Sequence, residues 1–561
     1  GPDADEEQSR LVQRRLEMLV EYDRGERLLK ETTLAVGVAE SRRIELGRDG
    51  RYRERRTGRV LEFADAYALY QDETPRQKHF LRAALEIFAV LGIGEVGYWL
   101  GQEISRTDWQ YNYDWEGVRA RFVTGSAYRM DSNVFDINAL WHAGSGLAFY
   151  MLSRQNGLNV LESFLMTTAA SAVWEIFGEF KENASINDLI FTPVAGMVIG
   201  EVMSQLGAFF DRGEDHLVNR VLSSIFGGPR ALHNWIDGNR PIRTGNVDGL
   251  GFTREIWHEF QLYTGAGGAM IARNGPGGPT QENRSEVHVG LETMIVNVPG
   301  YGAPGRTSRV LTEGNFSQLM IRMSASSEGI TDFMFFVKAA LAGYYQQNIT
   351  GSVDRRTGLP LQSTLQGYSF YIGAASAYEY NLHAQGPGQP LDRLAIVNVL
   401  GPSMELVYHY RGLKVKATLD VFGDFVTVRS YAIDKYIETT GFDPETAGRG
   451  TLAADRYYFA FGITVAPRIV VSYRNLELGG ELKIQSFRSI DGIDRFQERI
   501  ADDFSMTDSR VVTRAWLAYT LPGDWLRLSL VGERLTRSGS IRDLTVSSDE
   551  LRLYANMAVL F

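Results

Sequence analysis

The spacing of apolar residues changes once along the chain, near Phe252. Before this residue apolar positions recur at helical spacing, and after it apolar and polar residues alternate to the end of the chain. From Leu413 to Val421, for example, apolar residues alternate with Lys, Thr or Asp. Alternation with a period of two is typical of β-strands that have one apolar and one polar face. The pattern therefore predicts a helical first part and a β-rich second part.

Twelve segments of the second part show this alternation. Several exceed ten residues, which is longer than most soluble strands and long enough to cross a bilayer at a tilt. We expect strands at residues 254–273, 285–297, 315–325, 331–346, 364–382, 392–411, 413–424, 456–474, 476–488, 508–521, 525–537 and 548–561. Tight turns are expected at Arg411-Gly412, Asn475 and Pro522-Gly-Asp524, and long loops at 298–314, 347–363, 425–455, 489–507 and 538–547. Tight turns that alternate with long loops favour a membrane barrel over a soluble sandwich.

The last predicted strand ends on an aromatic residue, Phe561. Its apolar face includes Leu551, Leu553 and Met557, and its other face is polar. It resembles the C-terminal strand by which bacterial outer-membrane barrels are recognised for insertion. The resemblance implies a place in the bacterial outer membrane, with the barrel assembly machinery and outer-membrane lipids as partners. We therefore expect a transmembrane barrel of about twelve antiparallel strands over residues 250–561.

Polar residues recur at helical spacing inside the apolar helices between residues 131 and 212. Asn138, His142 and Gly146 lie four apart, so they share one face of a helix, with Gly146 leaving room for a neighbour. Glu175 and Glu179 repeat this spacing on the next helix. We expect these residues to form a polar cluster within a helical domain.

A third helix follows a turn that ends at Asp188. Gly196 and Gly200 allow another helix to approach closely, and Glu201 is the only charge in this apolar helix before Phe210. A buried charge costs several kcal/mol unless it is paired, so the acids in these helices require partners.

The helix expected from Phe80 to Leu100 is apolar but contains Arg82, Glu86 and Glu95. These three charges argue against a membrane span. An aromatic cluster follows it, at Trp99, Trp109, Tyr111, Tyr113 and Trp115. Such a cluster fits a membrane interface or a cap on the helical core about equally.

The helical stretch resembles an uncharacterised family of predicted Gram-negative outer-membrane proteins in which a similar segment precedes barrel strands. The likeness is carried by Asn138, His142, Gly146, Tyr150, Arg154, Gly157, Glu175, Glu179, Ser185, Asp188, Leu189, Pro193, Gly196, Gly200 and Glu201. A more distant similarity is to the VanZ-like membrane proteins, although Thr192-Pro193 replaces the Asn of their Asp-x-x-Ala-Asn pattern. Neither resemblance implies an established activity.

Three interpretations of the polar cluster remain open. His142, Glu175 and Glu179 can bind a divalent metal. Alternatively, His142 can act as a base with Glu175, Glu179 or Asp188 in a metal-free catalytic site. The third interpretation is a hydrogen-bonded network that only fixes helix register, with no cofactor. Further binding residues are expected at Asn138, Arg154 and Glu201.

Composition narrows the choice of function. A net charge of −10 argues against a nucleic-acid partner, and the absence of cysteine excludes disulfides and thiolate metal sites. No Gly-x-Ser-x-Gly elbow, phosphate loop or His-Glu-x-x-His motif is present. None of the familiar hydrolase or nucleotide-binding signatures therefore applies.

These patterns predict an α+β membrane protein with a charged N-terminal arm (1–74), a helical domain (75–240) and the barrel (250–561). Twelve strands enclose too little room for several helices, so we expect the helical domain beside or beneath the barrel, on the periplasmic side. Three functions follow: a barrel that anchors a helical domain handling lipid or envelope material, a lipid or glycolipid hydrolase or transferase, and a small-solute pore. Charges that pair across the lumen argue against steady conductance.

Overall fold

The computed structural model describes residues 34, 44–47, 49–54, 60–61, 77–100, 109–131, 133–238, 243, 247–276, 278–354, 359–384, 391–444, 451–490 and 505–561. Most of the predicted N-terminal arm and parts of the predicted loops 347–363, 425–455 and 489–507 lie outside these residues. Within the arm, β1 (Ile44–Leu46) and β2 (Tyr52–Glu54) pair antiparallel.

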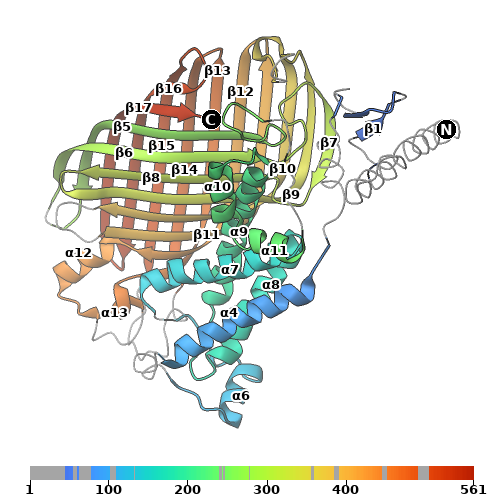
Figure 1. Cartoon of the computed structure of the whole chain (residues 1–561). Helices are drawn as coiled ribbons and strands as arrows, with labels where there is room; N and C mark the ends of the chain where they lie inside the picture. Colours follow the sequence, from blue (N-terminus) through green and yellow to red (C-terminus); the bar gives the residue numbers. More distant parts are fainter. Residues whose placement is uncertain are drawn as a thin grey trace. The chain divides into compact units, whose positions relative to one another are not determined.

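The second half of the chain forms a closed barrel of twelve antiparallel strands (Figure 1). Its strands are β5 (Trp257–Asn274), β6 (Thr280–Val296), β8 (Phe316–Ser326), β9 (Gly329–Thr350), β10 (Gln366–Ala384), β11 (Leu391–Tyr410), β12 (Leu413–Arg429), β13 (Tyr458–Tyr473), β14 (Leu476–Ser489), β15 (Met506–Thr520), β16 (Leu526–Ile541) and β17 (Leu544–Leu560). Each strand pairs with its neighbour in the chain, and β17 pairs with β5 to close the wall. The predicted barrel class and all twelve predicted strands are confirmed.

A short additional strand, β7 (Gly305–Leu311), lies in the predicted loop 298–314. It pairs with residues 343–349 of β9, while β8 pairs with residues 329–340 of the same strand. Strands β7 and β8 thus form one wall strand that is interrupted at residues 312–315. Strand β7 was not predicted from the sequence, because its residues are mostly polar and do not alternate.

The predicted long loop 538–547 is wrong. Strand β16 continues to Ile541 and β17 begins at Leu544, so a turn of two residues joins them. Arg542 has a positive φ of 50°, as a tight hairpin turn requires. The small polar residues before the turn concealed the strand in the sequence.

The lumen is polar, and its charges are largely paired. Lys416 lies 2.8 Å from Glu405 and Lys338 lies 2.7 Å from Asp420, which confirms the expected pairing of lumenal charges. A cavity of about 350 Å³ remains between the ends of the barrel. At one end α12 (Tyr431–Thr440) packs into an apolar cluster of strand residues. The lumen is therefore narrowed by charged pairs and obstructed at this end by an apolar cluster.

The loop after β6 narrows the lumen at the other end. Tyr301 Oη donates a hydrogen bond to Glu405 Oε1 at 2.5 Å. Gln347 of β9 holds the loop backbone, because its side-chain amide bonds to the carbonyl oxygens of Gly300 and Ala303. Both ends of the lumen thus carry an ordered obstruction.

The chain divides into two compact units, Phe80–Gln205 with Ile256–Phe561, and Gly1–His79 with Leu206–Glu255. The first contains α4 (Phe80–Leu100), α6 (Trp115–Phe122), the π-helix η2 (Ile137–Trp141), α7 (His142–Gln155), α8 (Val160–Val173), the π-helix η3 (Trp174–Gly178), most of α9 (Asp188–Arg212) and the barrel. The second contains β1, β2, α10 (Leu217–Gly227) and α11 (Arg230–Ile236).

Helices α7 and α9 cross at small residues, as the sequence predicted. A Cβ on Gly196 would lie 2.3 Å from the backbone of Gly146, and one on Gly200 would lie 2.5 Å from the ring of Tyr150. Both distances are far below van der Waals contact, so the crossing requires glycine at these positions.

The same helices pack against the outer face of the barrel wall rather than inside the lumen. The ring of Phe191 in α9 lies 5.6 Å from that of Phe425, which points away from the lumen side of β12. Tyr378 Oη of β10 donates a hydrogen bond to the carbonyl oxygen of Ala139 at 2.6 Å. Phe425 and Tyr378 are buried although they point out of the barrel. The helices therefore lie beside the barrel.

Candidate functional site

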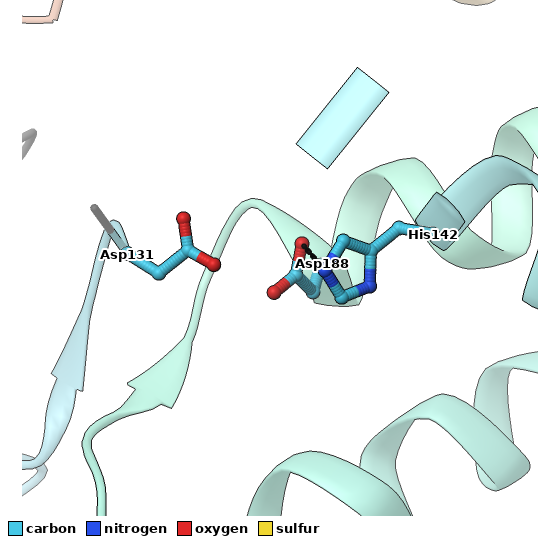
Figure 2. Close-up of side chains that lie close together, drawn as sticks. All are labelled: Asp131, His142 and Asp188. Carbon is cyan, nitrogen blue, oxygen red and sulfur yellow. Dashed lines mark ion pairs between the residues drawn. The ribbon is translucent and has the colours of Figure 1, made fainter. Parts of the chain in front are cut away.

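Three side chains with oxygen or nitrogen ligand atoms converge at one end of α7 (Figure 2). They are Asp131, His142 and Asp188, and one ligand atom of each lies within 4.8 Å of the others. His142 Nε2 lies 3.3 Å from Asp188 Oδ1. The atom is buried but makes no aligned hydrogen bond. One imidazole nitrogen and two carboxylates thus share a space of the size that a metal ion requires.

A short parallel bridge brings the two acids together. Strand β3 (Tyr128–Arg129) pairs with β4 (Ala184–Ser185), so the residues that follow both strands emerge side by side. Asp131 follows β3, and Asp188 begins α9 after β4. His142 is the first residue of α7, directly after the π-helix η2. Single π-helical turns occur frequently at functional sites.

Asn187 holds this arrangement in place. Its side-chain nitrogen donates to Asp188 Oδ1 at 2.9 Å and to Asp131 Oδ1 at 3.2 Å. Its side-chain oxygen accepts hydrogen bonds from the backbone N–H of Asp131 and from Ser185 Oγ, both at 2.9 Å. The amide therefore fixes the separation of the two carboxylates.

The barrel supports the site through Tyr457, which precedes β13. Asn138 Nδ2 donates to Asp131 Oδ1 at 2.6 Å and to Tyr457 Oη at 2.7 Å. Tyr457 Oη in turn donates to the carbonyl oxygen of Asn133 at 2.5 Å. The position of Asp131 thus depends on a side chain of the barrel.

The site lacks positive charge. Burial and the neighbouring Asp188 carboxylate raise the pKa of Asp131 to about 8. Within the described residues, no Lys or Arg side chain bonds to either carboxylate. Two acids that repel one another beside an unbonded imidazole nitrogen are a donor set suited to a divalent cation.

Only part of the predicted cluster comes together at this site. Glu175, in η3, accepts a hydrogen bond from the backbone N–H of Ser185 at 3.0 Å. Glu179 accepts one from Trp174 Nε1 at 2.9 Å. Neither glutamate belongs to the group of three ligand atoms around His142, where Asp131 and Asp188 stand instead. A catalytic role for the two glutamates stays a prediction.

Arg154 and Glu201 form a separate buried pair further along α7 and α9. Arg154 Nε donates to Glu201 Oε2 at 2.7 Å, and Tyr150 Oη donates to the same oxygen at 2.7 Å. Gln205 Nε2 donates to Glu201 Oε1 at 2.7 Å. The charges of Arg154 and Glu201 compensate one another, so this ion pair links α7 to α9. Its predicted role in binding a ligand stays a prediction.

Asp131, Asn187 and Tyr457 were not predicted as site residues from the sequence. Asp131 lies outside the helices in which polar residues recur at helical spacing, and Tyr457 lies in the barrel half of the chain, so only the fold shows that both are near His142. Asn187 had a usable signal, because an Asn-Asp pair at a helix start offers several polar groups in one turn.

Comparisons with known proteins give different results for the helical stretch and for the barrel. Residues 127–227 match the model of a domain of unknown function, DUF3943. This match covers the helical stretch with the candidate site, and the more distant likeness to VanZ-like proteins stays a prediction. Among curated proteins, none matches this chain.

Solved structures similar to the barrel are outer-membrane proteins. The P. putida toluene transporter TodX is 8% identical with a TM-score of 0.21, over 54% of this chain and 89% of that one. The translocator domain of the autotransporter NalP from Neisseria meningitidis is 9% identical with a TM-score of 0.18, over 55% and 88%. A Pseudomonas aeruginosa FadL homologue is 10% identical with a TM-score of 0.19, over 55% and 91%. Such low scores carry no functional conclusion, so the barrel class rests on the strand pairing, and the chain is similar to DUF3943 over its helical stretch.

Proposed function

We propose that this chain is an outer-membrane protein whose barrel anchors a helical domain that binds a divalent metal ion and uses it to handle lipid or envelope material. The observation that carries the proposal is the convergence of Asp131, His142 and Asp188 within 4.8 Å. One nitrogen and two oxygen ligands suit Zn²⁺ or Mn²⁺, because imidazole favours the former and carboxylates the latter.

Three protein ligands leave coordination positions for water or a substrate oxygen. A metal ion bound there would polarise a phosphoryl or carbonyl group. The surroundings suit an apolar substrate, since Trp141, next to His142, is 72% exposed and Leu140 is 42% exposed. A lipid whose headgroup carries phosphate or an ester fits both features. Hydrolysis or transfer on such a lipid is the enzymatic form of this proposal.

Metal binding can be measured on the full-length protein in detergent. After removal of metal with a chelator, we expect titration with Zn²⁺ or Mn²⁺ to show about one ion per chain, which raises the unfolding temperature. The variants Asp131→Asn, Asp188→Asn and His142→Gln should each weaken binding by at least about 100-fold, because each removes a direct ligand.

The matched control is Asp332→Asn. Asp332 lies beside a lumenal histidine, His383, at 3.3 Å, but pairs with Arg322. This variant should bind metal as the unmodified protein does. No metal binding in the unmodified protein, or equal losses in the control and the ligand variants, would show the proposal to be wrong.

A small-solute pore is a second candidate, favoured by the lumenal cavity of about 350 Å³. The apolar cluster around α12 and the Tyr301 loop obstruct the two ends. A pore would therefore need one obstruction to move. Planar-bilayer recording on the full-length protein should show no steady conductance, and stable open channels would favour the pore instead.

A further inference from the structure

We propose that α4, α7, α8 and α9 form a bundle that lies in the hydrocarbon layer beside the barrel, with the outward faces of α4 and α8 against lipid acyl chains. The proposal rests on membrane anchoring by the barrel, as proposed above, and does not depend on metal binding. It excludes the sequence-based prediction of a helical domain on the periplasmic side, so one experiment can decide between them.

Helix α8 and the π-helix after it carry their polar residues on the buried side. The buried positions recur every four residues, at Ser163, Thr167, Ser171 and Glu175. The opposite side has exposures between 41% and 64%, at Leu161, Leu165, Val173 and Phe177. A water-soluble helix has the reverse arrangement, with its apolar stripe toward the core. Polar residues that face the bundle interior are characteristic of helices within a bilayer.

Helix α4 shows the same reversal. Arg82 Nε donates to Oδ1 of Asn156, the residue that follows α7, and Asn156 Nδ2 donates to Glu86 Oε2 at 2.7 Å. The outward residues are 60–83% exposed, at Leu81, Leu85, Phe88, Ile93, Val96 and Leu100. Two of the three charges that argued against a span in the sequence are thus bonded inside the bundle, and the third, Glu95, accepts a hydrogen bond from Trp99 Nε1 of the same helix at 2.6 Å. What α4 presents outward is a continuous apolar surface.

The helices extend between the two rims of the barrel on its outer wall. Asn138 bonds to Tyr457 at the rim where β13 begins. Gln205 bonds to the carbonyl oxygen of Glu313 and to Asn297, at the opposite rim where β6 ends. Val160–Gly178, α4 and α9 have 19, 21 and 25 residues. At 1.5 Å per residue they are about 28–38 Å long, enough for a hydrocarbon layer of about 30 Å.

Helix α9, which contacts the barrel, and helix α8, on the outside of the bundle, differ in how much of each is buried. In α9, 83% of the most apolar window is buried, against 33% in Val160–Gly178. Helix α9 is therefore covered by protein on most sides, whereas α8 leaves one apolar face uncovered. Exposed apolar surface of this extent on a protein that also carries a transmembrane barrel indicates lipid contact.

Aromatic and basic residues gather where α4 ends. Trp109 Nε1 donates to Tyr98 Oη at 3.1 Å, and Lys181 Nζ lies 3.9 Å from the centre of the Trp109 ring. Tyr98 Oη also donates to Glu182 Oε1 at 2.7 Å. Trp, Tyr and Lys are the residues that typically mark the boundary between hydrocarbon and headgroups. Their position at the end of α4 matches the end of a membrane span.

The absence of cysteine allows single labels to be placed at will. We would introduce Leu85→Cys on α4 and Leu165→Cys on α8 into the full-length chain, attach a nitroxide, and insert the protein into phosphatidylcholine–phosphatidylglycerol vesicles. Electron paramagnetic resonance then measures collision with oxygen, which concentrates in hydrocarbon, and with a water-soluble nickel chelate. We expect both sites to collide with oxygen and to lose collision with the chelate.

Three labelled controls calibrate the result. Leu553→Cys on the outer face of β17 reports lipid, Glu438→Cys on α12 reports water, and Thr167→Cys on the buried side of α8 reports protein interior. The proposal is wrong if Leu85→Cys and Leu165→Cys match Glu438→Cys, which would place the helices in water. It is also wrong if they match Thr167→Cys, which would mean that another protein copy covers them. Failure of Leu553→Cys to report lipid would instead contradict the membrane anchoring. All of the labelled sites except Thr167 are exposed. If the Thr167→Cys variant fails to fold, the test remains valid as long as the Leu165→Cys variant folds.

Discussion

Two groups of described residues bring one histidine beside two carboxylates, and they differ in what surrounds them. In the lumen, His383 lies 2.7 Å from Glu550 and 3.3 Å from Asp332. Arg552 pairs with Glu550 at 3.0 Å, and Arg322 pairs with Asp332 at 3.2 Å. Every acid of the lumenal group therefore has an arginine partner.

In the helical domain, Asp131, His142 and Asp188 have amide and hydroxyl neighbours instead. Asn187 and Asn138 orient the acids but bring no positive charge. The lumenal group is thus a completed ion-pair network, whereas the acids of the helical group have no Lys or Arg partner among the described residues. Histidine beside two acids indicates a metal site only where the protein does not supply its own cations.

The largest effect is expected from removing a cation of the lumenal group. Arg552 is 1% exposed, so Arg552→Leu removes one of the two charge partners of the buried Glu550 and leaves only His383 beside it. We expect the free energy of unfolding to fall by about 3–5 kcal/mol. Urea unfolding in detergent, followed by the heat-dependent shift of the barrel on gels, measures this change.

The control for that variant is Arg534→Leu. Arg534 pairs with Asp549 at 2.6 Å, but both side chains are exposed, so its loss should leave the free energy of unfolding nearly unchanged. Equal destabilisation by the two substitutions would mean that the lumenal network does not differ from a surface pair.

A smaller effect is expected from the amide that orients the metal-site acids. Asn187→Ala keeps all three proposed ligands but releases the two carboxylates. We expect metal affinity to fall by about 10–100-fold, as is usual for residues that orient metal ligands. Asn183→Ala is the matched control, because Asn183 lies in the same turn and bonds to Gln110 instead. Similar affinities for the two variants in calorimetric titration would contradict the role of Asn187.

The smallest effect is a dependence on pH. The proposed metal site requires ionised Asp131, whose pKa is raised to about 8 in the metal-free protein. Affinity should therefore level off above pH 8 and fall by up to about tenfold per pH unit between 8 and 7. Below 7 it should fall more steeply, because the pKa of Asp188 is raised to about 7 and this second ligand then also takes up a proton. Calorimetry from pH 6 to 9 measures this slope, and an affinity that does not change over this range would contradict it.

The stability of the metal-free protein should change in the opposite sense. Folded Asp131 keeps its proton to higher pH than unfolded Asp, with its usual pKa of 3.8. The folded state then binds more protons than the unfolded state between about pH 4 and 8. Stability must fall as pH rises through this window, and bound metal should restore it.

The barrel could be predicted from the sequence because each wall strand has an apolar face on the outside of the barrel and a polar face toward the lumen. Stretches such as Leu413 to Val421 alternate for that reason, and the structure contains a strand at each of them. Strand β7 escaped because it pairs along only seven residues and is mostly polar. The length of the loop at 538–547 was overestimated because small polar residues show little alternation between apolar and polar positions.

The candidate site was predictable in part. Asn138, His142 and Asp188 stood out as polar residues in apolar helices, and they do lie together. Helical spacing shows which residues share a face but not which neighbour that face meets. Asp131 reaches His142 only through the two-residue bridge of β3 with β4, and Glu175 meets the backbone of Ser185 instead.

The interruption between β7 and β8 bears on the order of assembly. Residues 312–315 leave a gap in the wall, where Gln205 bonds to the carbonyl oxygen of Glu313, and Arg154 bonds to its carboxylate. If the barrel closed without α9, the polar backbone at residues 312–315, where the wall is interrupted, would be exposed. Because α9 precedes every barrel strand in the chain, it is already synthesised when β7 and β8 form. The helix can therefore hold β7 and β8 in place at the interruption between them, so that barrel closure and helix docking become a single cooperative step.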